Sequence, residues 1–307
     1  MSDIKLFHIA DGSVTQLTGT SIAVEKSLQH LIEAHLEEFL GVRFLASEYS
    51  TGKTHGGRID TLGMDENGYP VIIEYKRSLN QNVINQGLFY LDWLMDHKAE
   101  FTLLVMDLLG KEQANNVEWS KPRLLCIAGD FTRYNEHAVQ QINRNIELIR
   151  YRRYGDELLL FELVNTPTVQ AVEGSVEDDG PVVSKPKGTY KTITETLEQA
   201  NPQLRDRYEE LKAFLLALGD DVQINTLKYY FAFKRIKNFA SVEIRTAHDN
   251  ILAFVQVDPD SITLEKGFTR DVRNIGHYGT GDLEITIRDD EDLEKAKPLL
   301  VKSYEVS

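Results

Sequence analysis

Residues 57–77, GRIDTLGMDENGYPVIIEYKR, constrain the fold of this chain more than any other stretch. The alternation of apolar and polar residues in RIDTLGM favours a strand, and the apolar run of VIIEYKR favours a second, buried strand. Between them, Asn67-Gly68 is a strong signal for a tight β-hairpin. The two arms are therefore expected to pair in antiparallel fashion, with an amphipathic helix following over residues 82–97.

The pattern around this hairpin predicts an α/β domain. Apolar residues at helical spacing indicate helices, and short alternating or apolar runs indicate strands. Helices are expected over residues 22–40, 82–97 and 135–146, and further strands over residues 43–49, 100–109, 123–129, 146–153 and 157–163. This order predicts a mixed sheet flanked by helices, in a domain that ends near Asn165.

The length of 307 residues favours two domains rather than one. We place the first domain at residues 1–170. Residues 171–190 combine glycine, proline and charge with few apolar side chains, which is typical of a linker. Residues 191–307 again contain helix and strand patterns, and they predict a second, smaller α+β domain.

Composition disfavours several classes of function. A single cysteine rules out an internal disulfide, and the eight histidines show no H-E-x-x-H spacing for a zinc hydrolase. No signal peptide and no membrane-spanning apolar run is found, so a cytoplasmic protein without a membrane partner is expected. The net charge of the chain is −14, and neither domain is a basic domain of the kind that binds DNA. An acidic enzyme can still act on phosphodiesters, because acids hold its metal ions.

Two acids and a lysine lie on the two arms of the hairpin. Asp60 is on the first arm, and Glu74 and Lys76 lie two residues apart near the end of the second, so they share a face. Paired carboxylates repel unless a divalent cation joins them, and oxygen ligands suit magnesium. A lysine on the same face can orient an attacking water and stabilise a phosphorane-like transition state. We expect Asp60 and Glu74 to lie within reach of one ion.

The segment before the first arm, STGKTHGGR at residues 50–58, has the look of a phosphate-binding loop. The strict pattern requires a glycine where this chain has Ser47, and a helix where it has two consecutive glycines. A glycine-rich turn is therefore the better interpretation. Lys53 then makes a phosphate contact at most, and His55 lies in an exposed turn.

The stretch GGRIDTLGMDENGYPVIIEYKR resembles the core of the PD-(D/E)XK nuclease superfamily, in particular its NucS-like and RecB-like endonucleases. The resemblance covers residues 22–93 and implies a restriction-endonuclease-like mixed sheet. It also implies that Asp60 and Glu74 bind the metal together with the backbone carbonyl of Tyr75. By the same resemblance Lys76 is the catalytic lysine. Ile59 departs from the pattern, since the superfamily name has a proline before the first acid.

Three further residues enter through this resemblance. NucS-like enzymes carry another acid where this chain has Glu25, which is thereby implied as a further metal ligand. In the helix after the lysine, Gln86 and Tyr90 match the Q-x-x-x-Y pattern that RecB-like nucleases have near the active site. Residues four apart share a helix face, so both can face the metal. A plain amphipathic helix is the competing interpretation for this pair.

The second domain contains LKYYFAFKRIKNF at residues 227–239, in which aromatic and basic residues alternate. Such a pattern suits stacking on a single-stranded nucleic acid. A strand with one buried face is the competing and preferred interpretation. The domain resembles a C-terminal module known as a predicted transport protein, although no segment of this chain could cross a membrane. Recognition is a better expectation for it than catalysis.

Together these features predict an endonuclease that depends on Mg²⁺ or Mn²⁺ and hydrolyses phosphodiester bonds in nucleic acid, with DNA as the expected substrate. Genome defence and repair are the roles considered, and a homo-oligomer is compatible with them. The alternative is a catalytically silent nucleic-acid-binding or assembly protein on a nuclease scaffold. The sequence leaves open the choice between DNA and RNA, the strandedness of the substrate and the ligand of the second domain.

Overall fold

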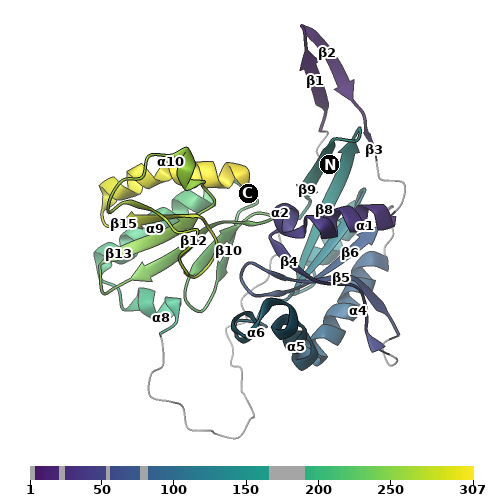
Figure 1. Ribbon diagram of the computed structural model, residues 1–307, viewed down its shortest axis with the longest axis horizontal. Helices are drawn as coiled ribbons and strands as arrows, with labels where there is room; N and C mark the ends of the chain where they lie inside the picture. Colours follow the sequence, from purple (N-terminus) through teal and green to yellow (C-terminus); the bar gives the residue numbers. More distant parts are fainter. Residues whose placement is uncertain (1–3, 21–24, 53–55, 77–81, 166–190) are drawn as a thin grey trace, which may run out of the picture. The chain divides into compact units, whose positions relative to one another are not determined.

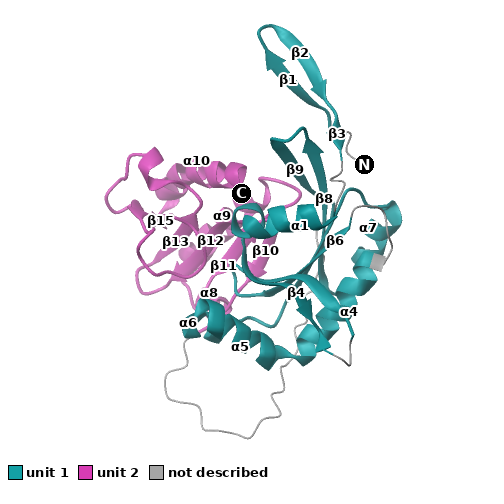
Figure 2. Ribbon diagram, turned by 45° about the vertical axis from the view of Figure 1, so that its right-hand side comes forward, with its two compact units in different colours: residues 1–170 teal, residues 171–307 magenta. Residues whose placement is uncertain are grey.

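The computed structural model of the chain describes residues 4–20, 25–52, 56–76, 82–165 and 191–307. The chain consists of two compact units, unit 1 at residues 1–170 and unit 2 at residues 171–307 (Figure 2). The predicted linker at residues 171–190 lies outside the described residues.

Unit 1 is built on a mixed sheet of seven strands in the order β3-β8-β7-β6-β5-β4, with β9 also pairing with β8 (Figure 1). The pairs β6–β7 and β7–β8 are parallel, and the other pairs are antiparallel. The strands are β3 (Gly19–Thr20), β4 (Val42–Ser50), β5 (Arg58–Asp65), β6 (Pro70–Lys76), β7 (Arg123–Ala128), β8 (Asn145–Tyr154) and β9 (Leu158–Leu163). The predicted α/β fold with a mixed sheet is confirmed.

Helices cover both faces of this sheet (Figure 1). Leu62 of β5 and Ile72 of β6 belong to one buried cluster with Leu94 of α4. Thr61, the neighbour of Leu62, instead donates to Glu33 of α1 at 2.6 Å. Because successive side chains of a strand point to opposite faces, α4 and α1 cover opposite faces of β5 and β6. The helices are α1 (Glu25–Ala34), α2 (Leu36–Leu40), α4 (Asn82–Asp96), α5 (Lys98–Leu109), α6 (Lys111–Asn115) and α7 (Arg133–Gln140).

The β5–β6 hairpin closes as the sequence predicts. The carboxylate of Asp65 accepts the backbone N–H groups of Asn67 and Tyr69, both at 2.9 Å. Gly68 has a φ of 83°, which favours glycine, and a Cβ there would lie 2.4 Å from a backbone oxygen of Asn116. Turn chemistry and close packing therefore both require glycine at this position.

The prediction of a strand over residues 100–109 is wrong, because this segment forms most of α5. Phe101 and Val105, four residues apart, are buried, whereas Leu103 and Leu108 are 55% and 54% exposed. That pattern is a helical face, but a dense run of apolar residues hides it in the sequence. Periodicity alone does not separate a buried strand from a helix in such a run.

The third predicted helix, residues 135–146, is also placed differently. α7 begins at Arg133, after the N-cap residue Thr132, whose hydroxyl accepts the N–H of Asn135. The helix ends at Gln140, and Asn145 already begins β8. Of the apolar residues near the predicted end of the helix, Ile146 belongs to the strand that follows and Ile142 lies in the turn before it.

A two-stranded hairpin near the N-terminus is absent from the sequence prediction. β1 (Leu6–Ala10) and β2 (Ser13–Leu17) pair in antiparallel fashion around Asp11 and Gly12. Both turn residues have positive φ, 50° and 74°, as a two-residue hairpin turn of the primed type requires. The Asp-Gly pair between two alternating segments was the signal that would have revealed it.

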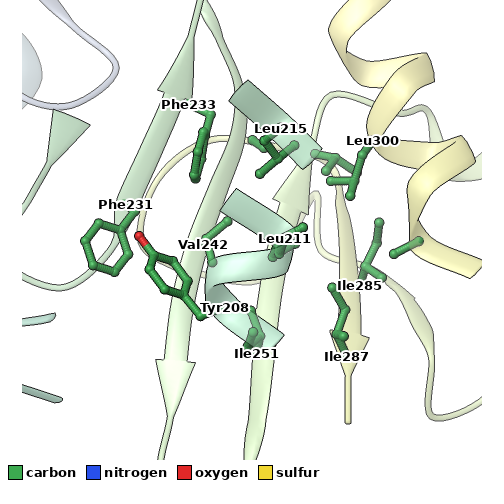
Figure 3. Close-up of a cluster of buried hydrophobic side chains, with 14 of the residues drawn as sticks. Tyr208, Leu211, Leu215, Phe231, Phe233, Val242, Ile251, Ile285, Ile287 and Leu300 are labelled. Carbon is green, nitrogen blue, oxygen red and sulfur yellow. The ribbon is translucent and has the colours of Figure 1, made fainter. Parts of the chain in front are cut away.

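Unit 2 has a six-stranded antiparallel sheet in the order β10-β11-β12-β13-β15-β14. Figure 3 shows Leu211 and Leu215 of α9 and Leu300 of α10 beside strand residues such as Val242 and Ile285. The predicted α+β fold is confirmed. The elements are α8 (Ile193–Glu198), α9 (Pro202–Leu216), β10 (Gln223–Thr226), β11 (Phe231–Lys234), β12 (Asn238–Arg245), β13 (Asn250–Val255), β14 (Thr269–Asp271), β15 (Leu283–Ile287) and α10 (Asp290–Val306). No helix in the described parts of either unit is long and apolar enough to cross a membrane.

The aromatic residues of the stretch at residues 227–239 contribute to the core of unit 2. Phe231 is 6% exposed, and Phe233 and Phe239 are fully buried in the cluster beneath the helices. Rings in such positions are unavailable for stacking on bases. The buried-strand interpretation is therefore correct for these three, and the stacking interpretation is wrong for them.

A buried ion cluster joins the hairpin to the parallel strands. Arg123 on β7 donates to Glu147 on β8 at 2.7 and 2.8 Å, and to Asp65 at the turn of the hairpin at 3.0 Å. The side chains of all three are at most 3% exposed. A buried charge is tolerated when it is paired and hydrogen-bonded, so each member of this cluster depends on the others.

Replacing the cation of this cluster tests that dependence. Arg123→Met should lower the free energy of unfolding of unit 1 by about 3–5 kcal/mol, because two buried carboxylates lose their partner. Urea unfolding followed by tryptophan fluorescence measures unit 1 selectively, since both tryptophans, Trp93 and Trp119, lie in it. The exposed Arg144→Met provides the control. Equal stability of the two variants would contradict the proposed importance of the cluster.

Candidate active site

The two predicted acids lie where the paired region of β5 and β6 ends. The register between these strands starts at Thr61 opposite Ile73, one residue inside Asp60 and Glu74. Glu74 lies two residues from Ile72, so its side chain is on the face covered by α4, and hydrogen bonds to the backbone bring Asp60 beside it. The structure therefore places the two acids side by side at the same end of the hairpin.

Hydrogen bonds from side chains to the backbone continue the pairing at this end. The N–H of Asp60 donates to Oε1 of Glu74 at 3.3 Å, and the N–H of Tyr75 donates to Oδ2 of Asp60 at 3.1 Å. Each carboxylate is thus bound to the neighbouring strand. The result is two acids held close together by the backbone around them.

Burial makes this pair electrostatically unusual. Glu74 is completely buried, and its Oε2 has no hydrogen-bond partner among the described residues. Desolvation, followed by the negative charge of Asp60, raises the pKa of Glu74 to about 9. Desolvation also raises the pKa of Asp60, although the Tyr75 N–H and Lys76 act in the opposite direction. Such a pair binds a proton unless a cation takes its place.

Lys76 and Glu25 form an ion pair beside the acids. Nζ of Lys76 lies 3.2 Å from Oε1 of Glu25, in the first turn of α1, and the side chains are 20% and 41% exposed. Burial tends to lower the pKa of Lys76, but the charges of Glu25, Asp60 and Glu74 outweigh it and the pKa is raised. Lys76 is therefore a fixed positive charge at neutral pH, and the Glu25 carboxylate is engaged by it.

Gln86 and Tyr90 connect α4 to the start of β5. Nε2 of Gln86 donates to the Tyr90 hydroxyl at 3.2 Å, and that hydroxyl also accepts the N–H of Arg58 at 3.1 Å. A Cβ on Gly57 would lie 2.5 Å from the Tyr90 ring, so the chain can approach the ring only through glycine. Tyr90 thus fixes the strand two residues before Asp60, and Gln86 supports Tyr90.

The donor set of the two acids fits a hard divalent cation. An orphaned, buried carboxylate oxygen beside a second carboxylate offers the oxygen ligands that Mg²⁺ and Mn²⁺ prefer. Among the residues that the structure describes, however, no group of three or more His, Cys, Asp and Glu side chains is arranged to hold a metal ion. Water and backbone oxygens, such as the carbonyl predicted for Tyr75, would therefore contribute to the ligand set.

The structure brings together most of the residues that the sequence singled out. Asp60, Glu74, Lys76 and Glu25 form one charged cluster, and Gln86 and Tyr90 reach it through the backbone of β5. Lys53 and His55 lie outside the described residues. Sequence reasoning missed Gln29 of α1, which donates to the carbonyl of Asp60 at 2.8 Å. Its position four residues after Glu25, on the same helix face, was the available signal.

Comparison with solved structures gives two partial likenesses to endonucleases. A repair endonuclease from Pyrococcus abyssi is 18% identical, with 45% of this chain and 51% of that chain covered and a TM-score of 0.29. An EndoMS–dsDNA2 complex is also 18% identical, with 43% and 47% covered and a TM-score of 0.25. The likeness thus spans about half the length of each endonuclease chain.

A protein family matches most of unit 2, and a curated protein matches nearly the whole chain. Residues 193–307, nearly all of the described part of unit 2, match a family model described as a domain of unknown function (DUF5655). An uncharacterized protein from Haemophilus influenzae is 30% identical over 306 residues, with 97% of this chain and 98% of that protein covered. The chain therefore belongs to the same protein family as this Haemophilus influenzae protein.

Proposed function

We propose that unit 1 is a metal-dependent nuclease that hydrolyses phosphodiester bonds in nucleic acid, with DNA as the substrate. The observation that carries this proposal is the pair of buried acids, Asp60 and Glu74, beside the charged amine of Lys76. A fully buried carboxylate with one oxygen that lacks a hydrogen-bond partner among the described residues supports a cation-binding role.

In this proposal Asp60 and Glu74 hold Mg²⁺ or Mn²⁺, with the carbonyl of Tyr75 as a further ligand. Such an ion would supply charge neutralisation for a phosphodiester and lower the pKa of a water molecule. The two carboxylates determine where the scissile phosphate sits. Each carboxylate accepts a backbone N–H of the other strand, and these hydrogen bonds keep both acids in place before the substrate arrives.

Lys76 supplies electrostatic stabilisation in this proposal. Because its pKa is raised, its amine carries a proton at neutral pH and acts as a positive charge near the reacting phosphate. Glu25 holds the amine from the side of α1. We assign Glu25 as a positioning residue for Lys76. The direct bond from Glu25 to the metal that the family resemblance implies stays a prediction.

Two exposed cations beside the site suit phosphate contacts. Arg58 precedes Asp60 by two residues on the same face, and Lys26 follows Glu25 on α1. Their side chains are 64% and 57% exposed, and both pair with Glu48, at 3.3 and 3.4 Å. Exposed pairs of this kind contribute little to stability, so a phosphate can replace Glu48 at small cost. Arg58 and Lys26 therefore supply positive charge beside the site, although the net charge of the whole chain is −14.

A catalytically silent nucleic-acid-binding or assembly protein is the second candidate. The observation that favours it is the lack, within the described residues, of a third acid arranged with Asp60 and Glu74 as a metal ligand. In that case the buried pair would keep a shared proton and Lys76 would remain with Glu25. The experiment below separates the two candidates.

The proposed function predicts nuclease activity that requires a divalent cation. Purified protein should cleave at least one of plasmid, single-stranded or branched DNA with Mg²⁺ or Mn²⁺, and a chelator should abolish cleavage. Glu74→Ala, Lys76→Ala and Asp60→Asn should each lower the rate at least about 100-fold, because each removes a charge on which the reacting centre depends. Initial rates on a fluorescent DNA substrate measure this.

The control for these variants is Glu112→Ala, an exposed acid of α6. Tryptophan fluorescence verifies that unit 1 remains folded in every variant. Cleavage at the wild-type rate by Glu74→Ala would reject the assignment of the site. Binding of DNA without cleavage under all conditions would instead favour the silent scaffold.

A further prediction concerns how pH changes the free energy of unfolding in the absence of metal. The pKa of Glu74 is about 9 in the folded chain against a reference value of 4.5, so folded Glu74 keeps a proton that the unfolded chain loses. Between those pH values the folded state binds more protons, and stability must fall as pH rises. Glu74→Gln removes this loss. Its stability advantage over wild type should therefore grow by up to about 1.4 kcal/mol per pH unit.

Urea unfolding in chelator from about pH 6 to about pH 8, the range in which only the unfolded state is ionised, measures this difference. Comparison with Glu74→Gln cancels the titration of the remaining groups, and Glu112→Gln is the matched control at an exposed position. A pH-independent difference between wild type and Glu74→Gln would show that Glu74 is ionised in the folded chain.

A further inference from the structure

Gln29 is a buried amide on the sheet-facing side of α1. It is 4% exposed, and its Nε2 lies 2.8 Å from the carbonyl oxygen of Asp60, 3.0 Å from Oε1 of Glu33 and 3.2 Å from Oγ of Ser47. The contact with Asp60 is the shortest of the three. A buried amide is costly to place in a core unless its hydrogen bonds are needed, and an apolar residue would pack there instead.

The contact with Asp60 lies at the end of the β5–β6 pairing. On the β4 side the register pairs Ile59 with Tyr49 and Thr61 with Ser47, and Glu48 between them has a φ of 53°. On the β6 side the register starts only at Thr61. Two side chains bind the backbone of Asp60 at this point: Glu74 accepts its N–H, and Gln29 donates to its carbonyl.

The same helix face makes two more contacts with this end of the sheet. Glu25, one turn before Gln29, pairs with Lys76. Glu33, one turn after it, accepts the hydroxyl hydrogen of Thr61, and Oγ1 of Thr61 lies 3.2 Å from the hydroxyl of Tyr75. Three successive turns of α1 thus contact residues of β5 and β6 that flank the acid pair. Gln29 is the central contact.

We propose that Gln29 is a positioning residue of the nuclease site, which fixes the backbone of Asp60 and so sets the direction of the Asp60 carboxylate toward the carboxylate of Glu74. The inference rests on the proposed function. Gln29 does not touch the substrate or the metal in this proposal. Its loss removes one of the two side-chain hydrogen bonds to the Asp60 backbone.

The test replaces Gln29 with methionine, which is of similar size and lacks the donor. Mn²⁺ affinity measured by calorimetry should weaken about 10–100-fold, as is typical when a residue that orients a metal ligand is lost. The kcat for DNA cleavage should fall similarly, while the KM for DNA stays unchanged. Ser47→Ala removes another partner of Gln29 but leaves Asp60 bound, so its Mn²⁺ affinity should remain near wild type.

The Mn²⁺ affinity of the wild-type protein distinguishes a failure of the proposed nuclease function from a failure of the role proposed for Gln29. If wild-type protein does not bind Mn²⁺, the proposed nuclease function fails and this inference fails with it. If wild type binds Mn²⁺ and Gln29→Met matches it in affinity and kcat, only the role of Gln29 is overturned. Should Gln29→Met lose its folded tryptophan signal, Gln29→Asn, whose amide is one methylene too short, replaces it. Unfolding of both variants would also overturn the proposal, because Gln29 would then be a packing residue of unit 1.

Discussion

A buried carboxylate without a counter-charge of its own is the constraint on which the candidate site depends. Glu74 is completely shielded from water, one of its oxygens has no partner among the described residues, and Asp60 lies beside it. An ionised carboxylate in such a place is unfavourable unless a cation compensates it. The group therefore keeps a proton or takes a share of a metal ion, and either state requires the surrounding chain to hold both acids in place.

The fold meets this requirement from both ends of one hairpin. At the turn, Asp65 binds the backbone of the turn and is itself bound by Arg123. At the open end, where the β5–β6 register has stopped, side chains bind the backbone: the two acids bind each other's strand, Gln29 binds the carbonyl of Asp60, and Tyr90 binds the N–H of Arg58. These contacts hold the two carboxylates close together.

Unit 2 contributes differently. Its aromatic residues Phe231, Phe233 and Phe239 form part of a packed core, so their abundance in the sequence reflects burial and not base stacking. The chemistry proposed for this chain lies in unit 1. The relative from Haemophilus influenzae aligns over 97% of this chain, so the match extends over both units. That relative therefore also contains the region of this chain that matches the domain of unknown function.

The sequence by itself determined the hairpin and the place of Asp60, Glu74 and Lys76 near its open end, while Gln86 and Tyr90 were implied by the family resemblance. Local chemistry suffices there, because Asn67-Gly68 fixes the turn and alternation fixes which side chains share a face. It failed for α5, where an apolar run fits either a strand or a helix, and it did not single out Gln29 of α1. Only the tertiary structure decided that Glu25 pairs with Lys76 and that Gln29 reaches Asp60. Those contacts join residues 31 or more positions apart in the chain, and no local pattern encodes the packing of a helix on a particular end of a sheet.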